Sequence, residues 1–248
     1  MSLLPTKYSR TRFGVQQQSS LSGDEYAKRS FRGFPIRYWD KLQSFRFEKK
    51  DPINVLNIGC GPGNWAIAAA TYNRNASVVG IDKNEHFLQL AAEYGRRLNA
   101  PNVEFVKLDY RQIPKHFETE SFDYIFTVNA LQYFDESPYF EIVSRVLKKA
   151  GTLLIFRTET IGWFLEKFIR GIKERNLPNV VSTVPAVIAG VAGQRFPSKT
   201  CEHVVTFRRT KRIAMHYGIE LKNIQHSEKL LCFPSFFDMV GKRLVRLS

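Results

Sequence analysis

The sequence predicts an α/β protein built on a doubly wound, mostly parallel sheet of seven strands with helices on both faces. Three observations support this fold class. Short apolar runs typical of buried strands alternate with longer helix-like segments between residues 53 and 158. These helical segments are long enough to cross over between parallel strands, and right-handed crossovers place them on both faces of a sheet. Two further strand-like runs close the chain.

The alternating region supplies five of these strands. In chain order we expect them at 53–58, 77–82, 103–109, 122–129 and 151–158. Helices are expected between them at 64–73, 85–98 and 137–149. The segment 85–98 shows the i, i+3, i+4 spacing of apolar residues that is typical of an amphipathic helix.

The pattern loosens after residue 160. A basic amphipathic helix is expected at 162–175, and a stretch rich in Pro, Gly, Val and Ala follows it. Another helix is expected at 206–218, where a glycine provides a common C-terminal stop. The closing strands are expected at 219–225 and 242–247. We therefore predict a helical and loop insert at 161–206, and inserts of this length are usually functional.

The polar N-terminal region, residues 1–34, is predicted to be a flexible arm or a cap over the substrate. Residues 35–248 are predicted to form the main domain, and their aromatic, basic start at 34–45 is expected to be a helix that begins near Pro35.

The composition narrows the class of protein. Cys60, Cys201 and Cys232 are an odd number of cysteines without metal-like spacing, which argues against a disulfide framework and against a metal site. The N-terminus has no apolar core of signal-peptide length, and the weakly polar stretch 180–193 is too short to span a membrane. We expect a cytoplasmic protein.

The net charge of +14 is unevenly distributed. Residues 1–50 carry 11 Lys/Arg and 4 Asp/Glu, residues 51–160 carry 11 and 13, and residues 161–248 carry 15 and 6. The two flanks are therefore basic and the middle is not. Such flanks attract anionic partners, although surface lysines kept for solubility are an equally ordinary explanation.

A glycine-rich turn follows the first predicted strand. Gly59, Gly61 and Gly63 lie between that strand and a helix, where bare backbone and free helix amides let a nucleotide approach. Asp82 ends the next strand, where a carboxylate can accept both hydroxyls of a ribose. Asp109 ends the third strand and is expected beside the same crevice.

The motifs "VLNIGCGPGNW", "VVGIDKNEHFL", "VEFVKLDYRQIP", "FDYIFTVNALQYF" and "LKKAGTLLIF" resemble, in this order, those of class I S-adenosylmethionine-dependent methyltransferases. The resemblance covers about residues 35–160 and the closing strands, and it implies the Rossmann-like methyltransferase fold. A dinucleotide-dependent oxidoreductase is the competing interpretation, but its turn usually reads G-x-G-x-x-G.

The resemblance implies S-adenosyl-L-methionine as cofactor and S-adenosyl-L-homocysteine as product. Gly59, Cys60 and Gly61 would lie against the methionine moiety. Asp82 would hold the ribose, with the Lys83 stem beside the adenine. The remaining implied cofactor positions are Gly63, Asp109 at the adenine amino group, the Tyr110 backbone at the ring and Asn129 near the sulfonium.

Asn57 departs from the family pattern, because most relatives have Asp or Glu there to help hold the amino group of the cofactor. An amide keeps the hydrogen-bonding reach but removes the charge. We expect binding to survive, weakened by about 1 kcal/mol, the scale of one hydrogen bond. A non-catalytic descendant of the family is the alternative.

Methyl transfer is an in-line displacement in which the protein mainly supplies proximity and alignment. The candidates for a general base are Tyr133, Glu159 and His203. Each has an ordinary structural explanation, as a packing, ion-paired or loop residue. The "NALQ" segment differs from the N-P-P-Y motif of amino-group methylation on bases, and no cysteine stands where a pyrimidine-C5 methylase needs its nucleophile.

In this family the acceptor meets the N-terminal arm and the segment after the fifth strand, which are the basic parts of this chain. We therefore predict O- or N-methylation of a small-molecule acceptor that is anionic or linked to sugar or lipid. The candidate acceptor-binding residues are Arg37, Tyr38, Trp39, Arg157, Trp163, Arg195 and Lys199. One alternative is an RNA methyltransferase. Another is a peripheral-membrane S-adenosylmethionine-binding protein that uses 162–175 as an interfacial helix.

Overall fold

The computed structural model describes residues 22–32, 52–159, 161–191, 205–226, 229–230, 233–234 and 236–244. The helix expected at 34–45 lies outside the described residues, as does most of the predicted arm. Among the described residues, no helix is both long and apolar enough to cross a membrane.

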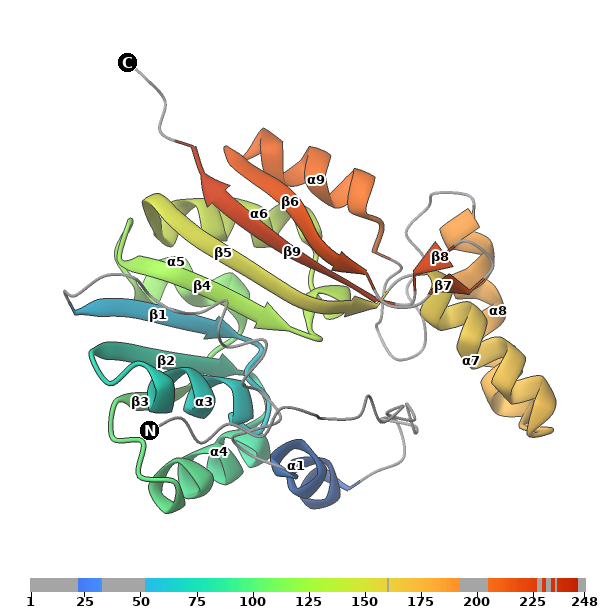
Figure 1. Cartoon of the computed structure of the whole chain (residues 1–248), viewed down its shortest axis with the longest axis horizontal. Coiled ribbons are helices and arrows are strands. Elements are labelled where there is room, and N and C mark those ends of the chain that lie inside the picture. Colours follow the sequence, from blue (N-terminus) through green and yellow to red (C-terminus); the bar gives the residue numbers. More distant parts are fainter. Residues whose placement is uncertain are drawn as a thin grey trace, which may run out of the picture.

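A seven-stranded sheet forms the centre of the molecule, in the order β3-β2-β1-β4-β5-β9-β6 (Figure 1). Its strands, in chain order, are β1 (Ile53–Ile58), β2 (Ala76–Asp82), β3 (Val103–Lys107), β4 (Phe122–Val128), β5 (Leu147–Glu159), β6 (Ile219–His226) and β9 (Phe236–Arg243). All pairs from β3 to β5 are parallel, whereas β9 runs antiparallel to β5 and β6. The predicted doubly wound, mostly parallel fold is confirmed.

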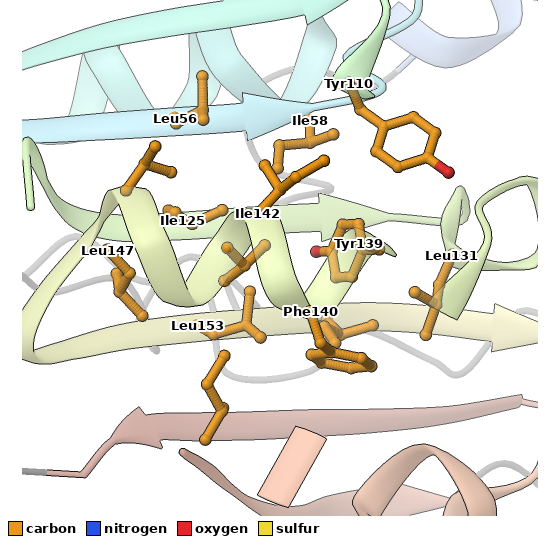
Figure 2. Close-up of a cluster of buried hydrophobic side chains, with 14 of the residues drawn as sticks. Leu56, Ile58, Tyr110, Ile125, Leu131, Tyr139, Phe140, Ile142, Leu147 and Leu153 are labelled. Atoms are coloured by element: carbon orange, nitrogen blue, oxygen red, sulfur yellow. The ribbon is translucent and has the colours of Figure 1, made fainter. Parts of the chain in front are cut away.

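Helices cover both faces of this sheet and bury one apolar cluster on each. On one face, α3 (Asn64–Tyr72) and α4 (Glu85–Arg97) lie against β2 and β3. On the other, α5 (Ile113–His116), α6 (Glu136–Val146) and α9 (Phe207–His216) enclose the larger cluster, part of which is drawn in Figure 2. In β1, Val55 belongs to the first cluster and Leu56 to the second, as the alternation of a strand buried on both faces requires.

The predicted N-terminal arm contains a helix, α1 (Gly23–Phe31), which the sequence analysis does not anticipate. Ser22 and Glu25 form a reciprocal capping box at its start, and this stabilises the first turn. The helix packs on α4, where Phe31 stacks on Tyr94 with 3.8 Å between ring centroids and Asp24 pairs with His86 at 3.1 Å. This part of the arm is therefore a docked helix.

The region after β5 also differs from expectation. The predicted helix at 162–175 corresponds to α7 (Ile161–Lys173), but the following segment forms a second helix, α8 (Leu177–Val191), instead of a loop. The short strands β7 (Lys229–Leu230) and β8 (Phe233–Pro234) pair with each other and contact α7. In Figure 1 these elements lie together, beyond the edge to which the β4 and β5 arrowheads point.

The closing strand is β9, at Phe236–Arg243, so the expected strand at 242–247 overlaps it at 242 and 243 but misses its start. Leu244 lies after the strand, and 245–247 lie outside the described residues. A glycine and a buried aspartate interrupt the apolar alternation by which this strand would be recognised in the sequence. A Cβ at Gly241 would come within 2.8 Å of the Leu221 side chain, so the small residue permits close packing in the sheet. Asp238 is buried as well. Strand propensity scored by apolar alternation misses both residues.

Candidate functional site

The carboxyl ends of the four parallel strands β1 to β4 meet at one edge of the sheet. Asn57 is paired with Gly80 of β2 and with Phe126 of β4, and Asp82 at the end of β2 is paired with Lys107 at the end of β3. The segments that follow these strands are therefore neighbours, as expected for a ligand crevice in a parallel sheet. They are 59–63, 82–84, 108–111 and 129–134.

The glycine turn after β1 takes a left-handed backbone at all three glycines, with φ of 70°, 53° and 83° at Gly59, Gly61 and Gly63. The amides of Gly59 and Cys60 both donate to the Ile81 carbonyl at 2.9 Å, which ties the turn to the end of β2. Glycine is the residue that adopts this conformation at least cost, and this explains the spacing of the motif.

The three glycines have different surroundings. A Cβ at Gly63 would come within 2.6 Å of the Ala91 Cβ and 2.7 Å of the Phe105 ring, so this glycine permits close packing of the helices and sheet. A Cβ at Gly59 would come within 3.0 Å of the Phe134 ring. A Cβ at Gly61 would meet no atom of the described residues within 4 Å. Gly61 is thus the position where the backbone faces open space that a ligand can occupy.

The Asp82 carboxylate is oriented by two backbone amides. Its Oδ2 accepts from the Gly61 amide at 2.9 Å, and its Oδ1 accepts from the Asn84 amide at 2.9 Å. Each oxygen retains capacity for a second donor. The carboxylate therefore lies fixed beside the open space at Gly61, and it can accept from a hydroxyl pair of a bound sugar. Lys83 is exposed next to it.

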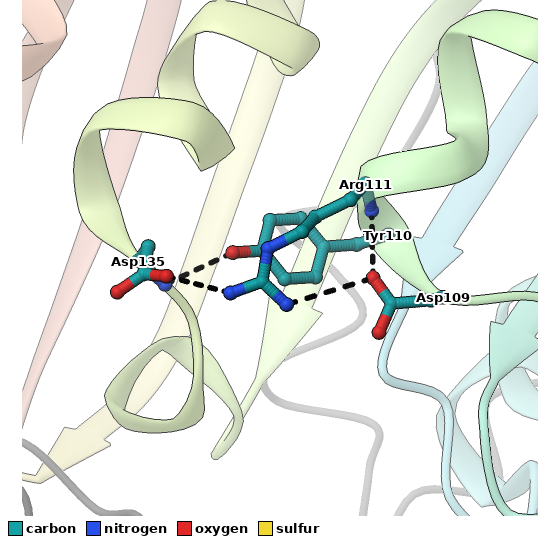
Figure 3. Close-up of polar contacts among 4 residues, drawn as sticks. All are labelled: Asp109, Tyr110, Arg111 and Asp135. Carbon is teal, nitrogen blue, oxygen red and sulfur yellow. Dashed lines mark hydrogen bonds and ion pairs between the residues drawn. The ribbon is translucent and has the colours of Figure 1, made fainter.

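A polar cluster joins the segment after β3 to the segment after β4 (Figure 3). The Asp109 carboxylate accepts from the Arg111 amide at 2.9 Å, and the Arg111 guanidinium lies 2.6 Å from Asp135 and 3.9 Å from Asp109. The hydrogen bond with Asp135 raises the pKa of Arg111. The Tyr110 hydroxyl accepts from the Asp135 amide at 3.1 Å, so the Tyr110 side chain is used in packing and its backbone remains for a ligand.

Two buried amide oxygens near this edge have no hydrogen-bond partner in the described part of the chain. The Asn57 side chain is 1% exposed and donates to the Phe126 carbonyl at 3.2 Å, but its Oδ1 is unpaired. Gln132 is 0% exposed and donates to Asn129, but its Oε1 is unpaired. An unpaired buried acceptor is costly, and a donor on a ligand relieves that cost. A cationic amino group is a donor of this kind.

The comparisons with known proteins agree with this geometry. A methyltransferase domain family matches residues 49–210, which is more than half of the chain. The chain belongs to this family. It is a class I methyltransferase domain, and the cofactor of that class is S-adenosyl-L-methionine. The glycine turn, the fixed Asp82 carboxylate and the unpaired acceptors fit such a ligand.

Relatives of this methyltransferase domain are similar to it over part of their length. A sterol 24-C-methyltransferase of Debaryomyces hansenii is 28% identical over 134 residues, covering 53% of this chain and 34% of that protein. Phthiotriol/phenolphthiotriol dimycocerosates methyltransferase 1 of Mycobacterium ulcerans is 36% identical over 101 residues, covering 40% of this chain and 35% of that protein. The matches thus span about a third of the length of these curated relatives.

Solved structures support the fold of the methyltransferase domain. A structure of phosphoethanolamine N-methyltransferase 2 from Haemonchus contortus, in complex with S-adenosyl-L-methionine, has a TM-score of 0.59 at 22% identity. The similarity covers 84% of this chain and 44% of that one.

The structure brings all the predicted cofactor positions to one edge of the sheet. They are Asn57, Gly59, Cys60, Gly61, Gly63, Asp82, Lys83, Asp109, Tyr110 and Asn129. Their individual contacts to the cofactor stay predictions. Cys60 is 5% exposed, and burial, followed by the Asp82 charge, raises the pKa of its thiol well above the ordinary value. The thiol is therefore protonated at neutral pH, and it donates to the Gly61 carbonyl at 3.6 Å.

The candidates for acceptor and base positions are less fully placed. Tyr133 lies on the short 3-10 helix η4 (Leu131–Tyr133) after β4 and is 41% exposed. Glu159 and Arg157 lie in the last part of β5, and Trp163 lies in α7, with side chains that are not described. The remaining candidates lie outside the described residues: Arg37, Tyr38, Trp39, Arg195, Lys199 and His203.

Sequence reasoning missed four residues that shape the crevice. They are Arg111, Gln132, Phe134 and Asp135. Arg111 and Asp135 are 24 residues apart in the chain, so only the fold reveals their ion pair. Gln132 stands in the "NALQYF" motif, and its polar side chain in an apolar run is the signal that could have found it.

Proposed function

We propose that this chain transfers a methyl group from S-adenosyl-L-methionine to a small-molecule acceptor that is anionic or linked to a sugar or lipid. One observation carries the proposal. Gly61 offers backbone with open space around it, and its amide donates to the Asp82 carboxylate that ends the neighbouring strand. Together they form a site for an adenosine-like ligand in a methyltransferase family.

The residues of this chain have separate tasks in the proposed reaction. When bound, S-adenosyl-L-methionine supplies a methyl group on a positively charged sulfur. Asp82 holds the ribose hydroxyls, and Asn57 and Gln132 provide acceptors for the amino group of the methionine moiety. The displacement itself then depends on how the acceptor is aligned with the methyl group. Tyr133, exposed after β4, is the base candidate whose side chain the structure describes, and its role is to take a proton or to orient the acceptor.

Two observations favour a lipid-linked or anionic acceptor. The similar proteins include methyltransferases named for a sterol, for phthiotriol/phenolphthiotriol dimycocerosates and for phosphoethanolamine. The basic flanks of the chain provide positive charge for an anionic group. RNA remains the second candidate, because basic residues with interleaved aromatics also suit nucleic acid.

The test is an acceptor panel. The purified chain is incubated with S-adenosyl-L-methionine and a lipid extract, phosphorylated sugars, phosphoethanolamine or bulk RNA, and S-adenosyl-L-homocysteine formation is measured. We expect turnover with at least one lipid or anionic small molecule. Turnover with RNA alone, or binding to RNA with a steep salt dependence, would instead establish the RNA alternative.

A further inference from the structure

Helices α7 and α8 form a close-packed hairpin beyond the edge of the sheet (Figure 1). A Cβ at Gly171 would come within 2.9 Å of the Val180 side chain and 3.1 Å of its amide nitrogen, so the glycine lets the two helices approach. The turn is defined by the left-handed Arg175, with φ of 52°, and by the Asn176 amide, which donates to the Gly171 carbonyl at 2.8 Å. The two helices are thus held together by close packing and by a defined turn.

The side chains of α8 that the structure describes differ sharply in exposure. Thr183 is 1% exposed on the inner face. The outer face carries an apolar row that we call the α8 stripe, made of Leu177 at 70%, Val181 at 63%, Val184 at 37% and Ile188 at 63% exposure. The spacing of four, three and four residues places these side chains in one line along the helix.

The α8 stripe concentrates the exposed apolar side chains of the described chain. Five of the eight large hydrophobic residues exposed there lie in this hairpin, the four of the stripe and Ile172 at 56%. The others lie apart from one another in the chain: Tyr133 on η4, Met215 on α9 and Leu244 just after β9. A contiguous exposed apolar row of this kind marks a binding surface, whereas isolated exposed residues need no explanation.

The charges beside the stripe indicate its partner. No residue of α8 is charged, whereas the adjoining end of α7 and the turn carry Arg170, Lys173 and Arg175 against Glu174. Lys173 and Arg175 are exposed. An apolar row next to basic residues complements an anionic lipid surface, where acyl chains lie below the headgroups. A second copy of this chain would instead bring another basic rim against the first.

We propose that the α8 stripe inserts into the interfacial region of a bilayer that contains anionic lipid, with Lys173 and Arg175 against the headgroups. This differs from the sequence-level alternative, in which the α7 segment is the interfacial helix. In the structure, α7 contacts α8, β5, β7 and β8, and the exposed apolar row lies on α8. The further consequence, that the acceptor is drawn from the bilayer, rests on the proposed methyl transfer.

The test is co-sedimentation of the full chain with vesicles. Vesicles of phosphatidylcholine with about a third phosphatidylserine are compared with vesicles of phosphatidylcholine alone, at low and high salt. We expect binding to the anionic vesicles that weakens with salt. Failure to sediment with the anionic vesicles overturns the proposal, as does equal, salt-insensitive binding to both kinds of vesicle.

Matched variants locate the contact. Val181→Ser combined with Ile188→Ser should lower the partition coefficient at least about tenfold, because two aliphatic side chains no longer enter the bilayer. Met215→Ser, an exposed apolar residue of α9, is the control and should leave binding unchanged. Lys173→Gln with Arg175→Gln should weaken binding to the anionic vesicles about tenfold or more. The charge-matched control is Lys211→Gln with Arg212→Gln on α9.

Two further readouts separate the outcomes. S-adenosyl-L-homocysteine affinity and the melting temperature are measured for every variant and should match those of the parent chain, so a loss of vesicle binding cannot be attributed to unfolding. These readouts also keep the docking proposal distinct from the proposed methyl transfer, which can fail while vesicle binding persists. If the parent chain is a dimer that the stripe variants convert to monomer, and vesicles are not bound, the stripe is an interface between copies and the proposal is wrong.

Discussion

The Asp82 carboxylate accepts a hydrogen bond from the Gly61 backbone amide at 2.9 Å. This bond joins the end of β2 to the glycine turn after β1, and the Asn84 amide holds the other carboxylate oxygen at 2.9 Å. The carboxylate is therefore oriented before any ligand arrives. Preorganisation of this kind reduces the entropy that binding would otherwise cost.

Replacing Asp82 with Asn should weaken S-adenosyl-L-homocysteine binding. The amide keeps one acceptor oxygen but loses the charge and the second acceptor, and losing charged hydrogen bonds of this kind costs about 1.5–3 kcal/mol, or roughly tenfold to a hundredfold in Kd. Isothermal titration calorimetry measures the change. Glu85→Gln is the control, because that exposed acid pairs with Lys107 instead. Equal affinity of Asp82→Asn and the parent chain would refute the role of Asp82.

Replacing Gly61 with Ala should affect binding more than stability. No atom in the described part of the chain lies within 4 Å of the new Cβ, so the cost to folding is the left-handed backbone at φ of 53°, about 1–2 kcal/mol. The methyl group would, however, occupy the space assigned to the cofactor. Calorimetry should show at least about a tenfold loss of S-adenosyl-L-homocysteine affinity while urea unfolding shows a modest loss of stability. Unchanged affinity would mean that the ligand lies elsewhere.

Replacing Gly63 with Ala should, in contrast, affect stability more than ligand binding. The new Cβ would come within 2.6 Å of Ala91 and 2.7 Å of Phe105, and the left-handed φ of 83° adds backbone strain. Overpacking and strain together should lower the unfolding free energy by about 3 kcal/mol. Urea denaturation measures this. A loss no larger than that of Gly61→Ala would show that this packing relaxes easily.

Replacing Asn57 with Asp should destabilise the ligand-free protein in a pH-dependent way. Asn57 is 1% exposed and donates to the Phe126 carbonyl, which an ionised carboxylate cannot do. Burial would raise the pKa of the new carboxyl, so stability is retained while it is protonated and is lost as pH rises through that raised pKa. We expect a loss of about 2–3 kcal/mol at neutral pH and a smaller loss in acid. A pH-independent effect would contradict this.

The Cys60 thiol should resist alkylation. Its pKa is raised above the ordinary 9.0, mainly by burial, so the thiolate population at mildly alkaline pH is very small. The sign for stability follows: the thiol favours the folded state at low pH, and this contribution is lost as pH rises above the ordinary value. Peptide mass spectrometry after iodoacetamide treatment should show slower modification of Cys60 in the folded chain than in the urea-unfolded chain. Equal rates would place the thiol at the surface.

Elements with strong periodicity were predictable from the sequence, and the strand β1 was predicted with its observed bounds, Ile53–Ile58. Prediction failed where tertiary packing, and not the local sequence pattern, determines the secondary structure. Helix α8 contains Pro185 and many β-branched residues, so its local propensity is poor, and it forms against α7 through the close approach at Gly171. The part of β9 before Lys242 was missed, because Gly241 fits a crowded site that sequence patterns do not record.

The site also has features that the sequence predicts and features that only the packed structure reveals. Residues at or just after the ends of parallel strands, such as Asp82 and Asp109, could be placed at one edge because topology alone brings strand ends together. The contacts among the side chains could not be predicted from the topology. The Arg111–Asp135 ion pair and the unpaired Gln132 oxygen depend on how the segment after β4 folds back toward β3.

A crystal structure of the chain with S-adenosyl-L-homocysteine tests the central claim most directly. The account predicts the ribose hydroxyls on the Asp82 carboxylate and the amino-acid moiety beside Gly61, with the amino group within hydrogen-bonding distance of the Asn57 or Gln132 side-chain oxygen. Ligand density away from this edge of the sheet, or a crevice filled by the Phe134 ring with no ligand at saturating concentration, would contradict it.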